Sequence, residues 1–142
     1  YPIIADDSGL VVDALNGEPG VYSARYAGDE SNDDDNIDLL LHRMTQEKNR
    51  KAYFHCSLIY LDPNNTSNPV LIETQWHGII CSEKSGDKGF GYDPIFFIPE
   101  LDKTSAELSV HEKNEYSHRG QAMKLLIERL RADNIISLKE NL

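Results

Sequence analysis

Two adjacent carboxylates stand out as residues that could do chemistry. Asp6 and Asp7 follow an apolar segment, residues 3–5, and precede Ser8 and Gly9. The apolar segment is typical of the end of a buried strand, and open α/β sheets bind ligands at the carboxyl ends of their strands. Carboxylates at such a place can hold a metal ion. Because side chains alternate along a strand, only one of the two aspartates can face a given site directly.

A tight turn explains the same residues without any chemistry. Asp, Ser and Gly each favour turns, and residues 2–5 and 10–14 are typical of two strand segments that flank a turn at residues 6–9. Taken alone, the composition of this stretch leaves both the metal-binding and the structural explanation open.

A glycine-rich stretch, residues 85–97, surrounds Phe90 with three glycines. Glycine lets the backbone come close to a ligand while the Phe90 ring presents an aromatic face, which suits stacking on a flat base. A glycine-rich loop that leads into an aromatic core strand has the same composition. The two explanations are equally consistent with these residues.

Two basic side chains occupy an unusual place near the end of the sequence. Ser117 is a predicted helix cap, so His118 and Arg119 lie in the first turn of the final helix. Cations there oppose the helix dipole, at a cost of roughly a few tenths of a kcal/mol each. Their position suggests an anionic or carbonyl-bearing ligand, and chance placement is the alternative.

The periodicity of apolar residues predicts the elements that position these side chains. A helix is expected over residues 33–47, begun by a capping asparagine and three aspartates. Strands are expected over residues 52–61 and 70–82, joined as an antiparallel hairpin by a polar connector. Capping boxes at Thr104–Glu107 and Ser109–Glu112 predict two short helical pieces. The final helix is expected to bury Met123, Leu126, Ile127 and Leu130.

Length and charge limit the classes of function. The 142 residues suffice for one domain, and the formal net charge of −10 at pH 7 disfavours nucleic-acid partners, which bind clustered Lys and Arg. A small anion remains compatible where a metal or a local basic pocket neutralises it. No stretch approaches the roughly 20 apolar residues that span a membrane, so a soluble, cytoplasmic protein is expected. Cys56 and Cys81 lack metal-site spacing and are expected to be free thiols.

The amino terminus is unusual. The sequence begins with Tyr1 and Pro2 rather than methionine, and it enters a predicted central strand within a few residues. We therefore expect residues 1–142 to be a single domain that lacks its amino-terminal part.

Three stretches together resemble the signature of the inosine triphosphate pyrophosphatase family, whose members hydrolyse non-standard purine nucleoside triphosphates. They are residues 5–28, which begin Ala-Asp-Asp-Ser-Gly-Leu, residues 89–96, Gly-Phe-Gly-Tyr-Asp-Pro-Ile-Phe, and residues 117–122, Ser-His-Arg-Gly-Gln-Ala. Lys113 also falls where that family keeps a lysine. Each stretch alone would be weak evidence, but the three in this order make the resemblance specific.

The resemblance implies a fold, a reaction and partners. The fold would be α/β, with a long mixed β-sheet and flanking helices in two lobes around a central nucleotide cleft, and the protein would be a homodimer. The reaction would be hydrolysis of ITP, dITP or XTP to the monophosphate and pyrophosphate, which cleanses the nucleotide pool. The implied cofactor is Mg2+, which neutralises the triphosphate so that a water oriented by a carboxylate can attack.

The resemblance also assigns roles to individual residues. Asp7 matches the catalytic base and metal-linked carboxylate, Ser8 matches a phosphate contact, and Asp6 would support the metal from behind. Phe90 would stack on the purine, and the residues that shape the base pocket would be Gly91, Tyr92 and Asp93. Donors that bind a 6-keto oxygen and reject the 6-amino group of adenine would come from Lys113, His118 and Arg119.

One part of the family pattern is not found. Members carry a Thr/Ser-Gly-Asn-x-x-Lys loop that cradles the triphosphate and a glutamate ligand on the following helix, and neither occurs in this sequence. The 142-residue chain alone is therefore expected to be inactive. Two alternatives stay open. One is a nucleotide-binding module without turnover, and the other is a modified-pyrimidine nucleotide pyrophosphatase of the septum-inhibitor type, against which the Ser-His-Arg segment speaks.

Overall fold

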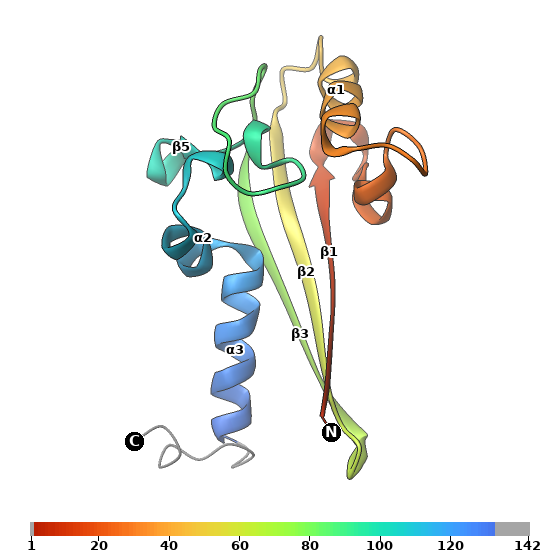
Figure 1. Ribbon diagram of the computed structural model, residues 1–142, viewed down its shortest axis with the longest axis vertical. Coiled ribbons are helices and arrows are strands. Elements are labelled where there is room, and N and C mark those ends of the chain that lie inside the picture. The colour runs from red at the N-terminus through yellow and green to blue at the C-terminus, as the bar shows by residue number, and fades with distance from the viewer. Residues whose placement is uncertain (1, 133–142) are drawn as a thin grey trace.

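The computed structural model describes residues 2–132, except for the side chains of residues 65–67. These residues form one five-stranded sheet with strands in the order β1-β2-β3-β4-β5. Figure 1 shows the first three strands side by side along the long axis of the molecule. The strands are β1 (Ile3–Val12), β2 (Lys51–Asp62), β3 (Asn65–Ile80), β4 (Phe96–Ile98) and β5 (Lys103–Thr104).

Every pairing among the described strands is antiparallel. β2 and β3 form the predicted hairpin, although β3 begins at Asn65 and leaves a tight turn where a longer polar connector was expected. The predicted α/β class with a long sheet and flanking helices is confirmed, whereas its mixed pairing is not seen within residues 2–132. Parallel neighbours need a crossover connection, and consecutive strands are neighbours here instead.

The segment around Asp6 and Asp7 differs from the prediction. Residues 3–12 form one unbroken strand, so the predicted turn at residues 6–9 is wrong. All ten residues pair with β2 in a single register. This ladder of backbone hydrogen bonds outweighs the local turn preference of Asp, Ser and Gly. The two aspartates therefore lie in the middle of β1 and not at its carboxyl end.

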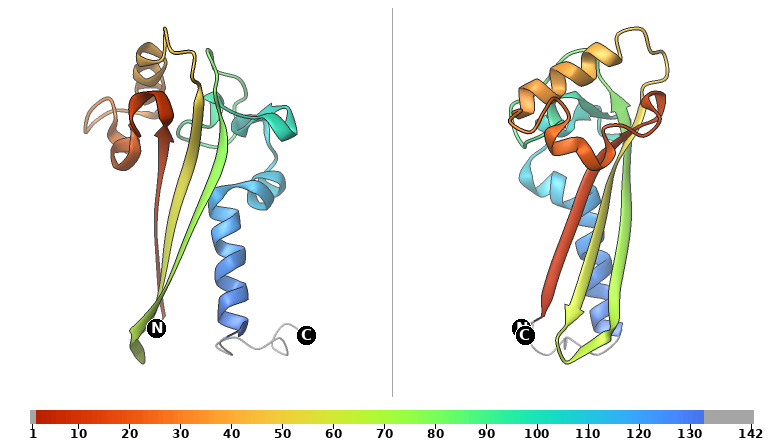
Figure 2. Two further views of the ribbon diagram at one scale, coloured as in Figure 1. Left: turned by 180° about the vertical axis from the view of Figure 1, so that it is seen from behind. Right: turned by 90° about the vertical axis from the view of Figure 1, so that its right-hand side faces the viewer.

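Helices cover one face and one end of the sheet. α1 (Asp33–Arg43) lies near the carboxyl end of β1, and α3 (His118–Ala132) runs beside the opposite half of the long strands (Figures 1 and 2). α2 (Val110–Tyr116) directly precedes α3 and packs against it. α3 packs on β2 and β3. This arrangement brings the start of α3 level with the middle of β1.

The helix starts follow the sequence predictions. The capping asparagine of α1 and the capping boxes at Thr104–Glu107 and Ser109–Glu112 are all present. α1 ends at Arg43 and not at residue 47. There the carbonyl of Met44 accepts a hydrogen bond from the Arg50 guanidinium at 2.7 Å, which satisfies a carbonyl that the helix end leaves free.

The core forms two clusters on the same face of the sheet, one under α1 and one under α3. β2 contributes to both through the buried face that its alternation predicted. α3 buries only part of the set that was predicted for it, because Met123 and Ile127 are exposed. His118 is fixed against the sheet and sets the phase of the helix, so the buried positions follow it in steps of four at Ala122, Leu126 and Leu130.

Both cysteines are free thiols, as predicted. Among the helices of residues 2–132, none has the length and apolar character needed to cross a membrane.

Candidate functional site

A cavity of about 390 Å³ lies where β1, the glycine-rich loop and the start of α3 meet. Its size is within the usual range of small-molecule sites. Every residue that the resemblance assigns to substrate binding lines it, and these residues come from three segments far apart in the sequence. They are Ser8 on β1, Phe90, Gly91, Tyr92 and Asp93 in the loop, and Lys113, His118 and Arg119 near the start of α3.

Phe90 presents an open aromatic face in this cavity. It is 62% exposed, and the Lys113 Nζ and Arg119 Cζ atoms lie 4.5 Å and 5.6 Å from its ring centroid. Both distances suit cation–π attraction. The loop needs glycine beside the ring, because Gly89 has a φ of 76° and a Cβ there would clash with Asp93 Oδ2.

Asp93 is buried, with 3% of its surface exposed. Its carboxylate accepts hydrogen bonds from the Phe90 N–H at 3.0 Å and from the Ser105 hydroxyl at 2.8 Å, and it forms an ion pair with Lys113. These partners use most of its hydrogen-bonding capacity within the protein. Asp93 therefore shapes the cavity by holding the loop backbone and the lysine in place.

Two contacts join the loop to the opposite wall of the cavity. The Tyr92 hydroxyl donates to the Ser23 carbonyl at 2.7 Å, and the Gly91 N–H donates to the Asp33 carboxylate at 2.9 Å. Burial raises the pKa of Tyr92, so its hydroxyl stays protonated as a donor. Ser23 and Asp33 line the cavity. The sequence left residues 21–26 open as either a structural loop or a wall of the cleft, and Asp33 was predicted only as a helix-start residue. Only the tertiary structure relates them to the loop, because no local pattern does.

His118 is buried and neutral at the start of α3. Its ring stacks on Phe54 with 4.9 Å between centroids, and its Nε2 lies 2.7 Å from the Ser8 hydroxyl. Burial, and then the positive charges of Arg119 and Lys113, lower the pKa of His118 to about 3. Among the described side chains its Nδ1 has no hydrogen-bond partner. A buried orphan of this kind is rare in native proteins and calls for a ligand or a water.

Arg119 reaches from the aromatic ring to β1. Its Nε lies 3.3 Å from Asp6 Oδ2, and both side chains are about half exposed. Asp6 lies on the same face of β1 as Ser8, because residues two apart in a strand point to the same side. Its cross-strand neighbour Leu58 belongs to the core under α3, which identifies this face as the one that carries the cavity.

Asp7 points to the other face of β1, opposite Ser57 of β2. It is exposed and does not line the cavity. The predicted alternation of the two aspartates is thus present. The structure brings Asp6 together with Arg119 and leaves Asp7 on the far side.

The two aspartates cannot both face one metal ion directly, because they lie on opposite faces of β1. Within residues 2–132, no group of three or more His, Cys, Asp or Glu side chains is placed to hold a metal ion. Mg2+ in nucleotide enzymes usually takes one or two carboxylates together with substrate phosphates and water. Among the described residues, β1 therefore offers one carboxylate at a time to such a site.

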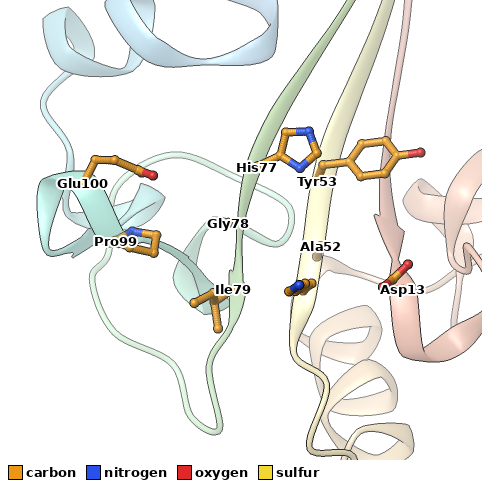
Figure 3. A pocket seen from close by; sticks show the side chains of 9 residues that line it. Asp13, Ala52, Tyr53, His77, Gly78, Ile79, Pro99 and Glu100 are labelled. Carbon is orange, nitrogen blue, oxygen red and sulfur yellow. The ribbon is translucent and has the colours of Figure 1, made fainter.

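A second cavity, of about 480 Å³, lies on the opposite face of the sheet. Figure 3 shows Tyr53 and His77 next to each other on adjacent strands, with Glu100 and Asp13 on either side. The two rings are 5.3 Å apart between centroids, so His77 has a packing role there. None of the predicted site residues lines this cavity.

Comparison with known proteins gives one family. The sequence model of the Ham1 family matches residues 1–129. The dITP/XTP pyrophosphatase of Pectobacterium atrosepticum is 54% identical over 132 residues, which are 92% of this chain and 67% of that protein. The dITP/XTP pyrophosphatase of Escherichia coli K12 is 51% identical over the same shares.

Solved structures agree with the sequence comparisons. The Ham1 protein of Staphylococcus aureus has a TM-score of 0.89 and 45% sequence identity, with 94% of this chain and 68% of that chain covered. A HAM1 protein from Coxiella burnetii has a TM-score of 0.88 and 42% identity, with 93% and 68% covered. The chain thus spans about two thirds of the length of these relatives.

Proposed function

This chain belongs to the Ham1 family, and on that basis we propose that the protein hydrolyses keto-purine nucleoside triphosphates such as dITP, ITP and XTP. The products are the nucleoside monophosphate and pyrophosphate. The family predicted from the sequence is confirmed, and its relatives at about half identity are named dITP/XTP pyrophosphatases. The reaction removes non-standard nucleotides from the pool.

The arrangement around Phe90 is the observation that best supports this function. A purine stacked on that open ring would meet the N–H donors of Lys113 and Arg119, and neither side chain can accept a hydrogen bond. A 6-keto oxygen accepts from such donors, whereas the 6-amino group of adenine presents a further donor. Sites built to pair a polar group reject a mismatched analogue strongly, because buried groups are then left unpaired.

Residues of β1 serve the phosphate end in this proposal. Asp7 would hold Mg2+ and orient or deprotonate the attacking water, with Asp6 as a supporting carboxylate, and the ion would neutralise phosphate oxygens. The Ser8 hydroxyl donates to a phosphate oxygen and accepts from the Nε2–H of His118, which lies 2.7 Å away. A hydroxyl can do both at once. The neutral state of His118 leaves that contact free of a titrating charge in the physiological range.

The assembly and location follow from the same resemblance. We propose a homodimer that acts in the cytoplasm, where nucleotide pools are used. Light scattering on the full-length protein measures the mass, and a monomer at micromolar concentration would contradict the first part.

The test of the function is pyrophosphate release by the full-length protein in Mg2+, with ITP, dITP, XTP, ATP and a modified pyrimidine triphosphate as substrates. We expect kcat/KM for the keto purines to exceed that for ATP by roughly 100-fold or more. Arg119→Ala should reduce this preference by about 1–3 kcal/mol. Tight binding of ITP without pyrophosphate release would identify a binding module instead. Faster turnover of the pyrimidine would identify the other rival.

A further inference from the structure

The aromatic ring that is proposed to stack on the base is not enclosed by the protein. Phe90 is 62% exposed, and the cations of Lys113 and Arg119 lie 4.5 Å and 5.6 Å from its ring centroid. The loop around it is rich in glycine, which places few limits on the backbone. The position of the ring therefore depends on how the loop backbone is fixed.

Two carboxylates accept hydrogen bonds from successive amides of this loop. The Phe90 N–H donates to Asp93 Oδ2 at 3.0 Å, and the Gly91 N–H donates to Asp33 Oδ2 at 2.9 Å. Asp93 lies three residues further along the same segment, whereas Asp33 is the first residue of α1 and lies 58 positions from Gly91. The first contact fixes the loop to itself, and the second fixes it to the opposite wall of the cavity.

A helix start explains Asp33 only in part. A carboxylate in the first turn of α1 favours the helix through its dipole, and Asp34 and Asp35 lie in the same turn. Asp33 differs from Asp34 because it lines the cavity of about 390 Å³ and contacts the loop backbone. Asp34 instead pairs with Lys84 at 2.9 Å and is not among the residues that line the cavity.

We propose that Asp33 is a positioning residue for the base: it holds the Gly91 backbone, so that the adjacent Phe90 ring stays where a purine can stack on it. This inference rests on the proposed function. Without the Asp33 acceptor, the ring samples more positions, and a bound base must then order it. Ordering of this kind on binding lowers affinity. The loss concerns the base and leaves the chemistry at the phosphates unchanged.

The variant Asp33→Ala is expected to keep the fold. Asp33 is exposed, and the next loop residue, Tyr92, is buried and donates its own hydrogen bond to the Ser23 carbonyl at 2.7 Å. The effect of the substitution should therefore be confined to residues 89–91. Far-ultraviolet circular dichroism of the variant should match the parent.

The first test needs no ligand and measures ¹⁵N relaxation of backbone amides in the full-length protein. We expect order parameters of about 0.85 for Phe90 and Gly91 in the parent and values below about 0.6 in Asp33→Ala. Asp34→Ala is the matched control, because it removes the same charge from the same turn and leaves the contact to Gly91 in place. Parental values in Asp33→Ala, or an equal decrease in Asp34→Ala, overturn the proposal.

The second test asks whether the ordered ring serves the base. With ITP as substrate, Asp33→Ala should raise KM about three- to ten-fold, the scale of one lost hydrogen bond, and kcat should stay within about two-fold of the parent. Asp33→Asn keeps an oxygen that can accept from the Gly91 N–H, so its KM should return to within about two-fold of the parent. A KM in Asp33→Asn as high as in Asp33→Ala contradicts the proposal, and so does a loss that falls on kcat.

A base without phosphates separates this proposal from the proposed function. The affinity of inosine, measured by calorimetry, should fall about three- to ten-fold in Asp33→Ala and stay parental in Asp34→Ala. The preference for ITP over ATP should change less than about two-fold in Asp33→Ala, because an aromatic face stacks on any purine. Unchanged inosine affinity in Asp33→Ala overturns the proposal. A parent that neither binds inosine nor hydrolyses ITP refutes the proposed function instead, and the relaxation measurement still decides whether Asp33 positions Phe90.

Discussion

The base end and the phosphate end of the site differ in how much of their structure the protein itself supplies. At the base end, Asp93 is buried with three partners, and it fixes both the Phe90 backbone and the Lys113 ammonium. At the phosphate end, Asp6 has one exposed ion pair and Asp7 is exposed on the other face of β1. In the proposed site, the contacts that would recognise the base are already in place, whereas the carboxylates of β1 would need substrate and a cation to complete their coordination.

This difference has an electrostatic origin. Lys113 carries a charge that is partly buried, so it needs a fixed partner, and Asp93 provides it. The carboxylates of the β1 aspartates are exposed, so water can solvate them. A site that binds a highly charged ligand can keep such groups solvated until the ligand arrives. The predictions below test this contrast between a prebuilt end and an open end.

Removal of the Asp93 carboxylate should cause the largest effect. Asp93→Ala leaves the Lys113 charge without its partner at a site where that side chain is 22% exposed. Breaking a buried pair from one side typically costs about 3–5 kcal/mol, and we expect the free energy of unfolding to fall by that amount in urea titration.

The matched control is Asp34→Ala. Asp34 pairs with Lys84 at 2.9 Å, but its side chain is 75% exposed, so the expected loss is below about 1 kcal/mol. Similar losses of unfolding free energy in the two variants would mean that the pair of Asp93 and Lys113 stabilises the fold no more than an exposed ion pair does.

Substitution of the exposed aspartates of β1, Asp6 and Asp7, should change turnover and leave stability nearly unchanged. In the full-length protein, Asp7→Asn is expected to lower kcat by roughly 100-fold or more, with a modest change in nucleotide affinity, because the lost charge acts mainly on the transition state. Asp6→Asn is the comparison, since Asp6 lies on the face of β1 that carries the cavity and Asp7 lies on the other face. A larger loss in Asp6→Asn than in Asp7→Asn would transfer the catalytic role to Asp6.

Local chemistry predicted much of this molecule. The capping boxes at Thr104–Glu107 and Ser109–Glu112 depend on residues three apart, and both are present. The alternation on β2 also depends on neighbours alone, and its buried face was correct. The family resemblance, and not local chemistry, assigned positions of the three motifs to one substrate site, and the positions it assigned to substrate binding line one cavity.

The failures share a cause in contacts between distant segments. The turn predicted at residues 6–9 is overridden by pairing with β2, which local composition does not reveal. The phase of α3 is set by His118 against the sheet, so Met123 and Ile127 are exposed although their spacing is helical. Asp33 looked like a helix-start residue and also accepts from the backbone of the loop, 58 positions away. The sequence around each of these residues contains no pattern that predicts the contact.

Acid should destabilise the protein through His118, a member of the fixed base end. An unfolded histidine takes up its proton near the ordinary pKa of about 6.5, whereas burial lowers the pKa of His118 in the folded state to about 3. The unfolded state therefore binds the proton first as the pH falls, and stability is lost between about pH 6.5 and about pH 3. From pH 7 to pH 5 the loss from this residue is about 2 kcal/mol.

The variant His118→Gln does not titrate, so its unfolding free energy should depend less on pH by that amount. Urea titrations of both proteins at several pH values between 7 and 5 give the difference, as an estimate of about 2 kcal/mol from linkage. His111→Gln, a change at an exposed histidine, should keep the parental slope. Equal slopes in His118→Gln and the parent would show that His118 charges freely in the folded protein.

The smallest effect concerns Ser8, which lies where the two ends meet. Its hydroxyl is proposed to contact phosphate, yet it is also 2.7 Å from Nε2 of His118, whose other ring nitrogen has no partner among the described residues. Ser8→Ala therefore leaves the buried ring without a hydrogen bond on either side, and the free energy of unfolding should fall by about 1 kcal/mol. Ser57→Ala is the control, because it removes a similar contact to His55, at 2.9 Å, on the open face of the sheet. Water can replace that partner, so we expect a loss below about 0.5 kcal/mol. If Ser8→Ala and Ser57→Ala lower the free energy of unfolding by the same amount, the contact between Ser8 and His118 does not stabilise the fold. Ser8 would then have a role only toward the phosphate.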